Sequence, residues 1–587
     1  MDGANLTAAK GKAIDLTARQ INIENHATVK AEAGEVRLVA RQGKGVASVT
    51  PDTNWHLRLP GEMPRKNSAG DITVRASTLD SSGDGAGRVA VWGRDIAISG
   101  PGGGADGNPA LAADNSGSSA RKTGAGVWLS ARSLSIDNAK ISGGARGPGA
   151  APGVNITARG DVTLSSDSRV VASTEGEGDG GKVAVRAGRD VSVTKSLVRA
   201  SSYLVNGRDT RAKAGEVKVI AGRNVNVSDE GEISAHTETS GQGGKVTVVA
   251  VTGDVSLSNG SWVYTQTTEP GEGGEISVRA GRDVAVTRSW VQASFPEGNK
   301  SKQDGAGRDD VEVVAQRNVN VSDGGEISTY TKTMGDGGGV TVRAVTGNVS
   351  IDGKGAKNSE FTGIDSVTES RGNAGDVAVI AKDTVTIANG GSISTSVTPR
   401  KYFDRFAQSS VLGSTAVSKG KNTERQWGDI KITAGPLVSM ANATITADVR
   451  GAYEGKPGNI QINSTALMMQ SSAITANPRG GGEGGNIALN VQGLLIDGNN
   501  VILGGTDIKP LHYGVPGWNI VHAAEPDRLY LLSASVLNLH GILPGLGGPQ
   551  FDTSSLSEQY CTLGEGSSLT RKGKGGLLPK GDDLLLY

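Results

Sequence analysis

The chain has 587 residues with 88 glycines, 19 prolines and one cysteine, and its 60 Lys and Arg residues balance 60 Asp and Glu residues. The balanced charge argues against a nucleic-acid partner, which would need a basic excess, and no apolar run reaches the length of about 18 residues that a membrane-spanning helix needs. The lone Cys561 excludes a disulfide framework and a multi-cysteine metal site.

The region from residue 180 to 350 repeats itself. The segment that begins at Gly181, GKVAVRAGRDVSV, returns at Gly274 as GEISVRAGRDVAV. Between these two points, related units begin at Gly181, Gly215, Gly244 and Gly274, at intervals of 34, 29 and 30 residues. A unit of about 30 residues cannot enclose a core alone, so neighbouring units must stack on one another.

Each unit contains three short runs in which apolar residues alternate with period two, and this pattern predicts β-strands. In the unit at Gly215 the inward positions are Val217, Val219, Ala221, Val225, Val227, Ile233 and Ala235. Gly-Arg-Asp or Gly-Arg-Asn separates the first two runs, and turns of the Ser-Asp-Gly and Ser-Asn-Gly type follow the second, because Gly, Asn and Asp tolerate positive φ. Three strands and three bends predict one coil of an all-β parallel β-helix. A β-sandwich or propeller array is the alternative, although its units are usually longer and carry hairpins.

Similar units extend over residues 1–500, which predicts roughly 16 coils. They begin at Ile14, Gly70, Gly87, Gly126, Gly153, Gly375, Gly428, Gly458 and Gly485. Non-repetitive insertions interrupt them near residues 54–67, 101–123, 203–213, 296–308 and 399–427. At least three of these follow the third strand of a unit, where insertions form either a binding face or bare surface loops. Residues 501–587 are expected to form a terminal coil, a cap and an irregular tail.

The residues also resemble a known family. The strand pattern Gly-[Asp/Asn/Lys]-[Val/Ile]-x-[Val/Ile] covers most of residues 12–500, and the tail contains Cys561-Thr-Leu-Gly-Glu-Gly-Ser-Ser-Leu followed by Gly-Lys-Gly-Gly-Leu-Leu-Pro579. The strand pattern and the tail motif are both similar to those of filamentous haemagglutinin-like exoproteins of two-partner secretion, in their cyanobacterial form. The resemblance implies a right-handed β-helix, export through an outer-membrane β-barrel transporter and an adhesive role at the cell surface.

The amino-terminal secretion domain of that family is absent from this sequence, and the first residues lack the basic and apolar regions of a signal peptide. We therefore interpret the chain as a fragment of an exported protein that works outside the cell or at its outer surface. Export of the chain as it stands requires a secretion domain encoded upstream of Met1.

Two polar features have a simpler structural explanation than a binding site. Arg159-Gly160-Asp161 matches an integrin-binding tripeptide, but it occupies the turn that carries Gly-Arg-Asp in other units. Acidic glycine turns at 175–181, 271–274 and 335–338 could hold Ca²⁺, but the calcium-binding nonapeptide is not present as a series and solvated turns explain them better. A polysaccharide lyase or hydrolase would need clustered carboxylates, and the six histidines are scattered. We expect no catalytic residues, no metal and no cofactor.

The candidate site is aromatic. Aligned third strands place Leu197, Glu232, Trp262, Trp290 and Glu326 at one outward position, and Arg199, Ser234, Tyr264, Gln292 and Ser328 at the next. Trp262, Tyr264 and Trp290 should therefore be neighbours on the solvent face. Sugars stack well on such rings, so a glycan-binding patch is one interpretation. Rings that pack on each other, or that the loop at Phe295 covers, are the other.

The sequence as a whole favours a non-catalytic adhesin stalk that attaches to a cell-surface glycan or to a receptor on a host or neighbouring cell, or that acts as a spacer. A β-helical polysaccharide-degrading enzyme and a degenerate remnant of a larger exoprotein are the alternatives.

Overall fold

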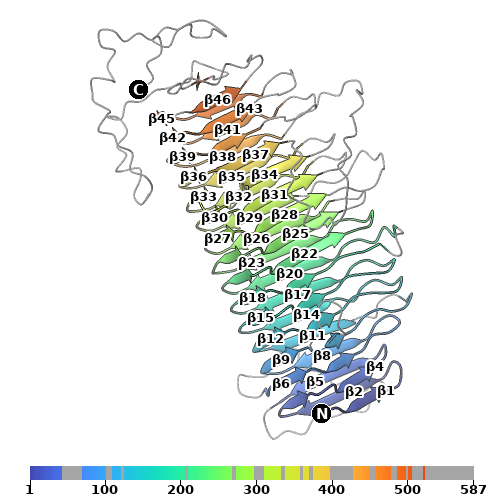
Figure 1. Ribbon diagram of the computed structural model, residues 1–587. Helices are drawn as coiled ribbons and strands as arrows, with labels where there is room; N and C mark the ends of the chain where they lie inside the picture. Colours follow the sequence, from blue (N-terminus) through green and yellow to red (C-terminus); the bar gives the residue numbers. More distant parts are fainter. Residues whose placement is uncertain are drawn as a thin grey trace, which may run out of the picture.

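The fold is a three-sided right-handed parallel β-helix, here described from a computed structural model (Figure 1). The described residues are 1–41, 69–100, 109–119, 124–204, 209–267, 273–295, 310–331, 337–356, 361–368, 374–396, 428–447, 457–476, 485–497, 500–504 and 520–521. They contain strands and turns and no helix. Fifteen coils each give one strand to each of the three sheets, close to the predicted number of roughly 16.

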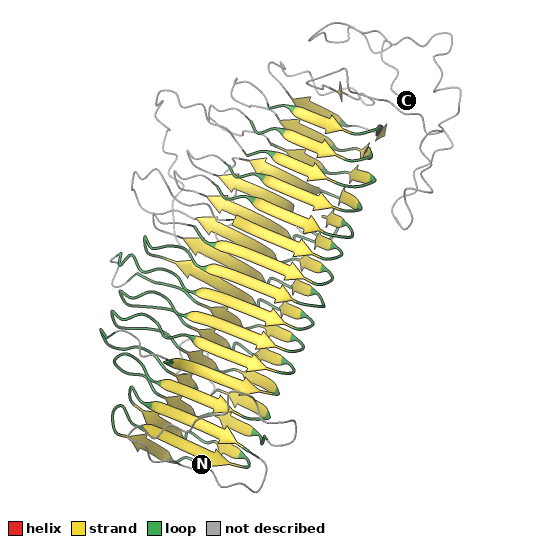
Figure 2. Ribbon diagram, turned by 180° about the vertical axis from the view of Figure 1, so that it is seen from behind, coloured by secondary structure: helices red, strands yellow, loops and turns green. Residues whose placement is uncertain are grey.

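Equivalent strands of successive coils pair in parallel, so each sheet runs the length of the stack (Figure 2). The first sheet contains β2 (Ala13–Ala18), β5 (Glu35–Ala40), β8 (Arg88–Trp92), β11 (Gly126–Ala131), β14 (Val154–Ala158), β17 (Lys182–Ala187), β20 (Glu216–Ala221), β23 (Lys245–Ala250), β26 (Glu275–Ala280), β29 (Asp310–Ala315), β32 (Val340–Ala344), β35 (Val377–Ala381), β38 (Ile430–Thr433), β41 (Ile460–Asn463) and β44 (Ile487–Asn490).

The second sheet contains β3 (Ile21–Ile23), β6 (Ile72–Arg75), β9 (Asp95–Ser99), β12 (Ser133–Asp137), β15 (Val162–Ser165), β18 (Val191–Thr194), β21 (Val225–Ser228), β24 (Val255–Ser258), β27 (Val284–Thr287), β30 (Val319–Ser322), β33 (Val349–Asp352), β36 (Thr384–Ala388), β39 (Leu437–Ala441), β42 (Ala466–Gln470) and β45 (Gly493–Asp497).

The third sheet contains β1 (Asn5–Ala8), β4 (Thr28–Ala31), β7 (Thr78–Asp80), β10 (Leu111–Ala112), β13 (Lys140–Ser142), β16 (Arg169–Val171), β19 (Leu197–Arg199), β22 (Glu232–Thr237), β25 (Trp262–Thr267), β28 (Trp290–Phe295), β31 (Glu326–Thr331), β34 (Thr362–Thr368), β37 (Gly391–Ser396), β40 (Thr444–Thr446), β43 (Ala473–Ala476), β46 (Val501–Gly504) and β47 (Ile520–Val521).

The core consists of ladders in which like side chains stack from coil to coil. Val219, Val248 and Val278 are paired in register in the first sheet, and each is fully buried. Burial of a valine side chain contributes about 1.5–3 kcal/mol. The alternation predicted from the sequence is therefore the true inward register. The bends also match, since Asn259 and Gly260 have φ of 56° and 77° between the second and third strands.

Two details of the predicted organisation differ from the structure. The Gly- and Ala-rich segment 101–123 was expected to be an insertion, yet Leu111 is fully buried in β10 and pairs with Leu79 and Ile141. The residues next to Leu111 are alanines, so the segment lacks the alternation of larger apolar residues that indicates a strand. The unit at Gly70 was expected to begin a coil, but β6 pairs with β3 and β9 in the second sheet. Residues 42–68 therefore separate the first strand of that coil from its second.

The other predicted insertions are only partly described. Residues 203–204 and 209–213 lie between β19 and β20, where the backbone N–H of Lys213 donates to Asp179 Oδ1 at 2.9 Å. The insertions near 54–67, 296–308 and 399–427 lie outside the described residues, as does residue 561 with nearly all of the segment 501–587.

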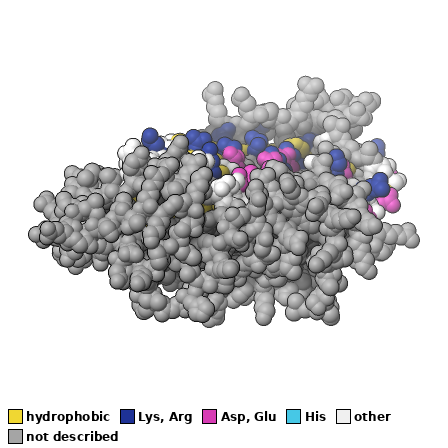
Figure 3. All heavy atoms as spheres, turned by 90° about the horizontal axis from the view of Figure 1, so that it is seen from above, with side chains coloured by type: hydrophobic (Ala, Val, Ile, Leu, Met, Phe, Trp, Pro, Cys, Tyr) yellow, Lys and Arg dark blue, Asp and Glu magenta, His cyan; other side chains and the backbone are white. Residues whose placement is uncertain are grey.

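Charged side chains on the outer surface follow the same stacking. Lys182, Glu216, Lys245 and Glu275 occupy one outward row of the first sheet, and the signs alternate over these four coils. Nζ of Lys182 lies 2.5 Å from Glu216, and Nζ of Lys245 lies 2.7 Å from Glu275. Figure 3 shows basic and acidic side chains interspersed over the visible described surface. Stacked like charges would repel, and alternation removes that repulsion.

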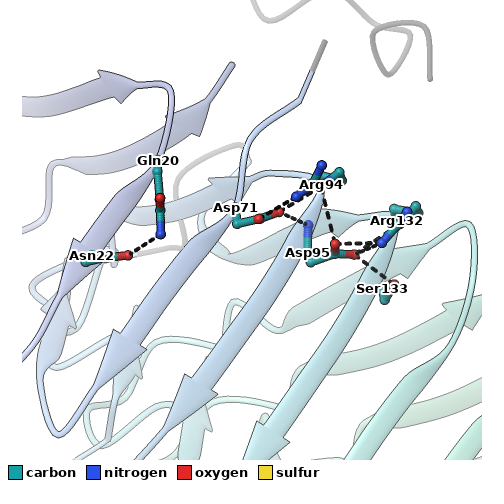
Figure 4. Close-up of polar contacts among 7 residues, drawn as sticks. All are labelled: Gln20, Asn22, Asp71, Arg94, Asp95, Arg132 and Ser133. Carbon is teal, nitrogen blue, oxygen red and sulfur yellow. Dashed lines mark hydrogen bonds and ion pairs between the residues drawn. The ribbon is translucent and has the colours of Figure 1, made fainter. Parts of the chain in front are cut away.

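A second ladder of polar groups joins the bends between the first and second strands (Figure 4). Arg94 donates from Nε and Nη2 to the carboxylate of Asp71 in the preceding coil at 2.9 and 2.6 Å, and Arg132 contacts Asp95 in the same way. Oδ1 of Asp71, which accepts the bond from Arg94 Nε, also accepts the backbone N–H of Asp95 at 3.3 Å. Each Gly-Arg-Asp turn thus binds the next coil through its Asp.

This ladder also accounts for Arg159-Gly160-Asp161. Asp161 Oδ1 accepts the backbone N–H of Asp190 at 3.1 Å and lies 3.4 Å from Nε of Arg189. The carboxylate that an integrin-type receptor would bind is therefore already used between coils.

The inward register makes an asymmetric prediction for two adjacent residues. Val248→Asp places a carboxylate in a dry ladder, where an unpaired charge costs several kcal/mol, so the rod should lose its cooperative unfolding transition or melt far earlier. Thr247 lies on the outer face between Lys218 and Ser277, and Thr247→Asp should change stability by less than about 0.5 kcal/mol. Thermal unfolding followed by circular dichroism measures both variants. Similar losses from the two substitutions would contradict the register.

The turn ladder predicts a weak acid sensitivity. Burial alone would raise the pKa of Asp283, but hydrogen bonds from Arg317 and Asn318 outweigh it and lower the pKa. A carboxyl group with a lowered folded-state pKa stabilises the fold above its unfolded pKa of about 4, and this contribution disappears as the pH falls through the folded value.

Asp283→Asn keeps an oxygen for the backbone N–H of Asn318, since Asn224 and Asn318 fill the same role in other coils. The variant should lose less than about 1 kcal/mol at pH 7, because Arg317 is half exposed. The difference in stability between wild type and variant should be smaller at pH 3 than at pH 7 in denaturant titrations. A difference of the same size at both pH values would show that the carboxylate charge is not the cause.

Candidate binding site

The candidate site lies on the outer face of the third sheet, over β19, β22, β25 and β28. Glu232, Trp262 and Trp290 are paired in register, and Ser234, Tyr264 and Gln292 form the next outward row. These are the rows that the sequence alignment predicted. Trp262, Tyr264 and Trp290 are all half-buried, so the structure brings the three predicted residues together on one face.

The two tryptophans stack on each other. The ring centres of Trp262 and Trp290 are 4.1 Å apart and their planes differ by 19°, while Tyr264 meets Trp262 edge-on at 6.3 Å. Because the tryptophans occupy paired positions of adjacent coils, the line joining their centres follows the rod, and the stacked rings turn their edges outward. The faces that meet are closed to a ligand, so mutual packing is part of their role.

Two further rings extend this row and were not among the predicted residues. His236 stacks on Tyr264 with ring centres 6.2 Å apart, and Tyr203 meets His236 edge-on at 5.2 Å. His236 is the next outward residue of β22 after Ser234, so one more step along the strand alignment would have found it. Tyr203 follows β19 in an irregular segment, where no periodic signal indicates which way a side chain points.

A buried ion pair lies beside the rings. Arg199 donates from Nε and Nη2 to Glu232 Oε1 at 2.9 and 2.6 Å, and Ser234 Oγ donates to the same oxygen at 2.5 Å. Nη1 of Arg199 reaches the hydroxyl of Tyr203 at 3.3 Å. Burial alone would lower the pKa of Arg199, but the Glu232 carboxylate outweighs it and the pKa is raised. The guanidinium therefore stays charged and is matched by one carboxylate.

The remaining ionisable groups of the site are neutral. Burial, with a smaller effect of the Arg199 charge, lowers the pKa of His236 to about 3. Its Nδ1 lies 2.9 Å from Ser201 Oγ. Burial, followed by the Glu232 charge, raises the pKa of Tyr264. At neutral pH the site thus contains one positive and one negative charge, held together.

Two acidic residues lie on the neighbouring strands, and the acidic glycine turns are the other candidates from the sequence. Glu326 and Asp365 point outward from the adjacent strands β31 and β34, but they are only 5% and 0% exposed, which suits structural contacts better than a polymer substrate. In the acidic turn 175–181 Asp179 accepts the backbone bond from Lys213, and parts of the turns at 271–274 and 335–338 lie outside the described residues.

Among the described residues no three His, Cys, Asp or Glu side chains are grouped so as to hold a metal ion. The same residues include no helix that is long and apolar enough to cross a membrane. No family model, curated protein or solved structure matches this chain.

Burial of His236 predicts a pH effect on stability. The folded pKa of about 3 lies below the unfolded value of about 6.5, so the unfolded chain binds a proton first as the pH falls. The contribution of this residue to the free energy of unfolding should decrease by about 1.6 kcal/mol between pH 6.5 and pH 5. The measurement compares wild type with His236→Asn across that range. Parallel pH profiles of the two proteins would contradict a buried neutral imidazole.

Proposed function

We propose that the chain is a non-catalytic adhesin-type stalk that acts outside the cell and attaches through the outer face of its third sheet. The observation that carries the proposal is the row of Trp290, Trp262, Tyr264, His236 and Tyr203 on that face, in direct ring contact across four coils. Partly exposed aromatic groups next to charged hydrogen-bonding groups are typical of sites that bind carbohydrate.

The rod supports the same proposal. A solenoid in which each coil is bonded to the next through three sheets holds its surface groups at fixed spacing and can project them away from the point of attachment. The expected ligand is a glycan on a cell surface, and the expected route is export through an outer-membrane β-barrel transporter, as the resemblance to haemagglutinin-like exoproteins implies. A polysaccharide-degrading enzyme remains the second candidate from the sequence, and no contact between described residues favours it.

The proposal predicts that Trp262→Ala combined with Trp290→Ala weakens binding to cell-surface polysaccharide. Edge contacts of this kind contribute roughly 0.5–1.5 kcal/mol per ring, so the double variant should bind about tenfold more weakly or worse. The fold should persist because Val263 and Val291 stay in the buried ladder. A glycan array and a cell-adhesion assay provide the measurement.

Trp128→Ala is the matched control, because Trp128 is 37% exposed on the first sheet and lies away from the row. It should bind like wild type. Undiminished adhesion by a folded double variant would refute the site, and a double variant that unfolds would show that the rings serve only the rod.

A further inference from the structure

The polar half of the site indicates which sugars it would accept. We define the Arg199–Glu232 cluster as Arg199, Tyr203, Glu232, Ser234 and His236. Its side chains are packed against the aromatic row, since Glu232 pairs with Trp262 and His236 stacks on Tyr264. Arg199 and Glu232 keep 22% and 15% of their side-chain surface exposed. A ligand on the rings would therefore also meet these two groups.

The hydrogen bonds within the cluster are distributed unevenly over the Glu232 carboxylate. Oε1 accepts the bonds from Arg199 Nε, Arg199 Nη2 and Ser234 Oγ. Oε2 has no partner among the described residues, so it can accept a further hydrogen bond. Two of the Arg199 nitrogens are directed to Glu232 and the third to the Tyr203 hydroxyl. The acceptor of the pair is thus open, while three of the five guanidinium N–H groups are used internally.

We propose that the Arg199–Glu232 cluster makes this surface selective for uncharged sugar chains, with Glu232 Oε2 accepting a sugar hydroxyl beside the edges of Trp262 and Trp290. This inference rests on the proposed glycan-binding function. A hydroxyl donating to a carboxylate forms a charge-assisted hydrogen bond, which is stronger than a bond to a neutral oxygen. A uronate or sialate would instead bring a second anion next to Glu232, and Arg199 is already matched.

The neutral imidazole of His236 supports the same selectivity. It is only 8% exposed and carries no charge, so it gives an anionic ligand no counter-charge. Arg199 is the one cation of the cluster, so selectivity depends on its pairing with Glu232. Removal of the Glu232 charge should therefore invert the preference of the site.

The test is a comparison of an uncharged glucan with a polyuronate, measured for affinity to the folded full chain. Wild type should bind the glucan more tightly. Glu232→Gln should bind the glucan about fivefold more weakly and should gain binding to the polyuronate that disappears at high salt. Arg199→Gln is the reciprocal variant, and it should bind the polyuronate less than wild type does. If Glu232→Gln does not fold, the binding of Arg199→Gln to the polyuronate tests the proposal instead.

Glu275→Gln is the matched control, because it leaves Lys245 without its partner on the first sheet and adds the same net charge elsewhere. Its binding to both polymers should equal that of wild type. A wild-type preference for the polyuronate, or an equal gain in Glu275→Gln, would overturn the selectivity while leaving glycan binding in place. Wild type that binds neither polymer would overturn the proposed function and this inference together.

Discussion

In-register parallel pairing of successive coils is the constraint on which the structure depends. Every strand of a coil lies on its equivalent in the next, so a side chain meets the residue at the same position one coil away. Inside the rod this places Val219 on Val248 and Val248 on Val278, and β-branched side chains pack well in such ladders. The interior is narrow and can exclude water only if nearly every coil supplies a small apolar residue at each inward position.

The same constraint acts on the outer surface with the opposite consequence. A sequence that repeated without change would stack each charge on its own kind, which is unfavourable at cross-strand distances. The row Lys182, Glu216, Lys245 and Glu275 avoids this by alternating sign. In the turns, Asp residues do follow one another, as Asp254 and Asp283 do, and an Arg from the next coil lies against each of them. The core therefore favours exact repetition, whereas the surface requires variation.

The coils and the buried positions could be predicted from the sequence, because in a stack of in-register coils the place of a residue in the repeat determines whether its side chain faces inward or outward. The interval between units predicted the coils, and the alternation predicted which valines are buried. Prediction failed where the periodic signal was weak. The strand at Leu111 is surrounded by Ala and Gly. The strand at Ile72 was expected to be the first strand of a coil and is the second, because residues 42–68 separate it from the first strand. The alternation of β22 also places His236 outward, two residues after Ser234, so its position follows from the sequence. Tyr203 lies in an irregular segment, where periodicity does not indicate the direction of a side chain.

The aromatic row shows how the ladder shapes a surface that departs from repetition. Two tryptophans at one outward position of adjacent coils stack on each other, because the spacing between coils is close to the distance between the centres of two stacked rings. The stack uses one face of each ring and leaves edges outward. Most of the specific hydrogen bonding must therefore come from neighbouring rows, where Arg199 and Glu232 lie. On this face the rings supply contact area, and the ion pair beside them determines which chemistry that area can recognise.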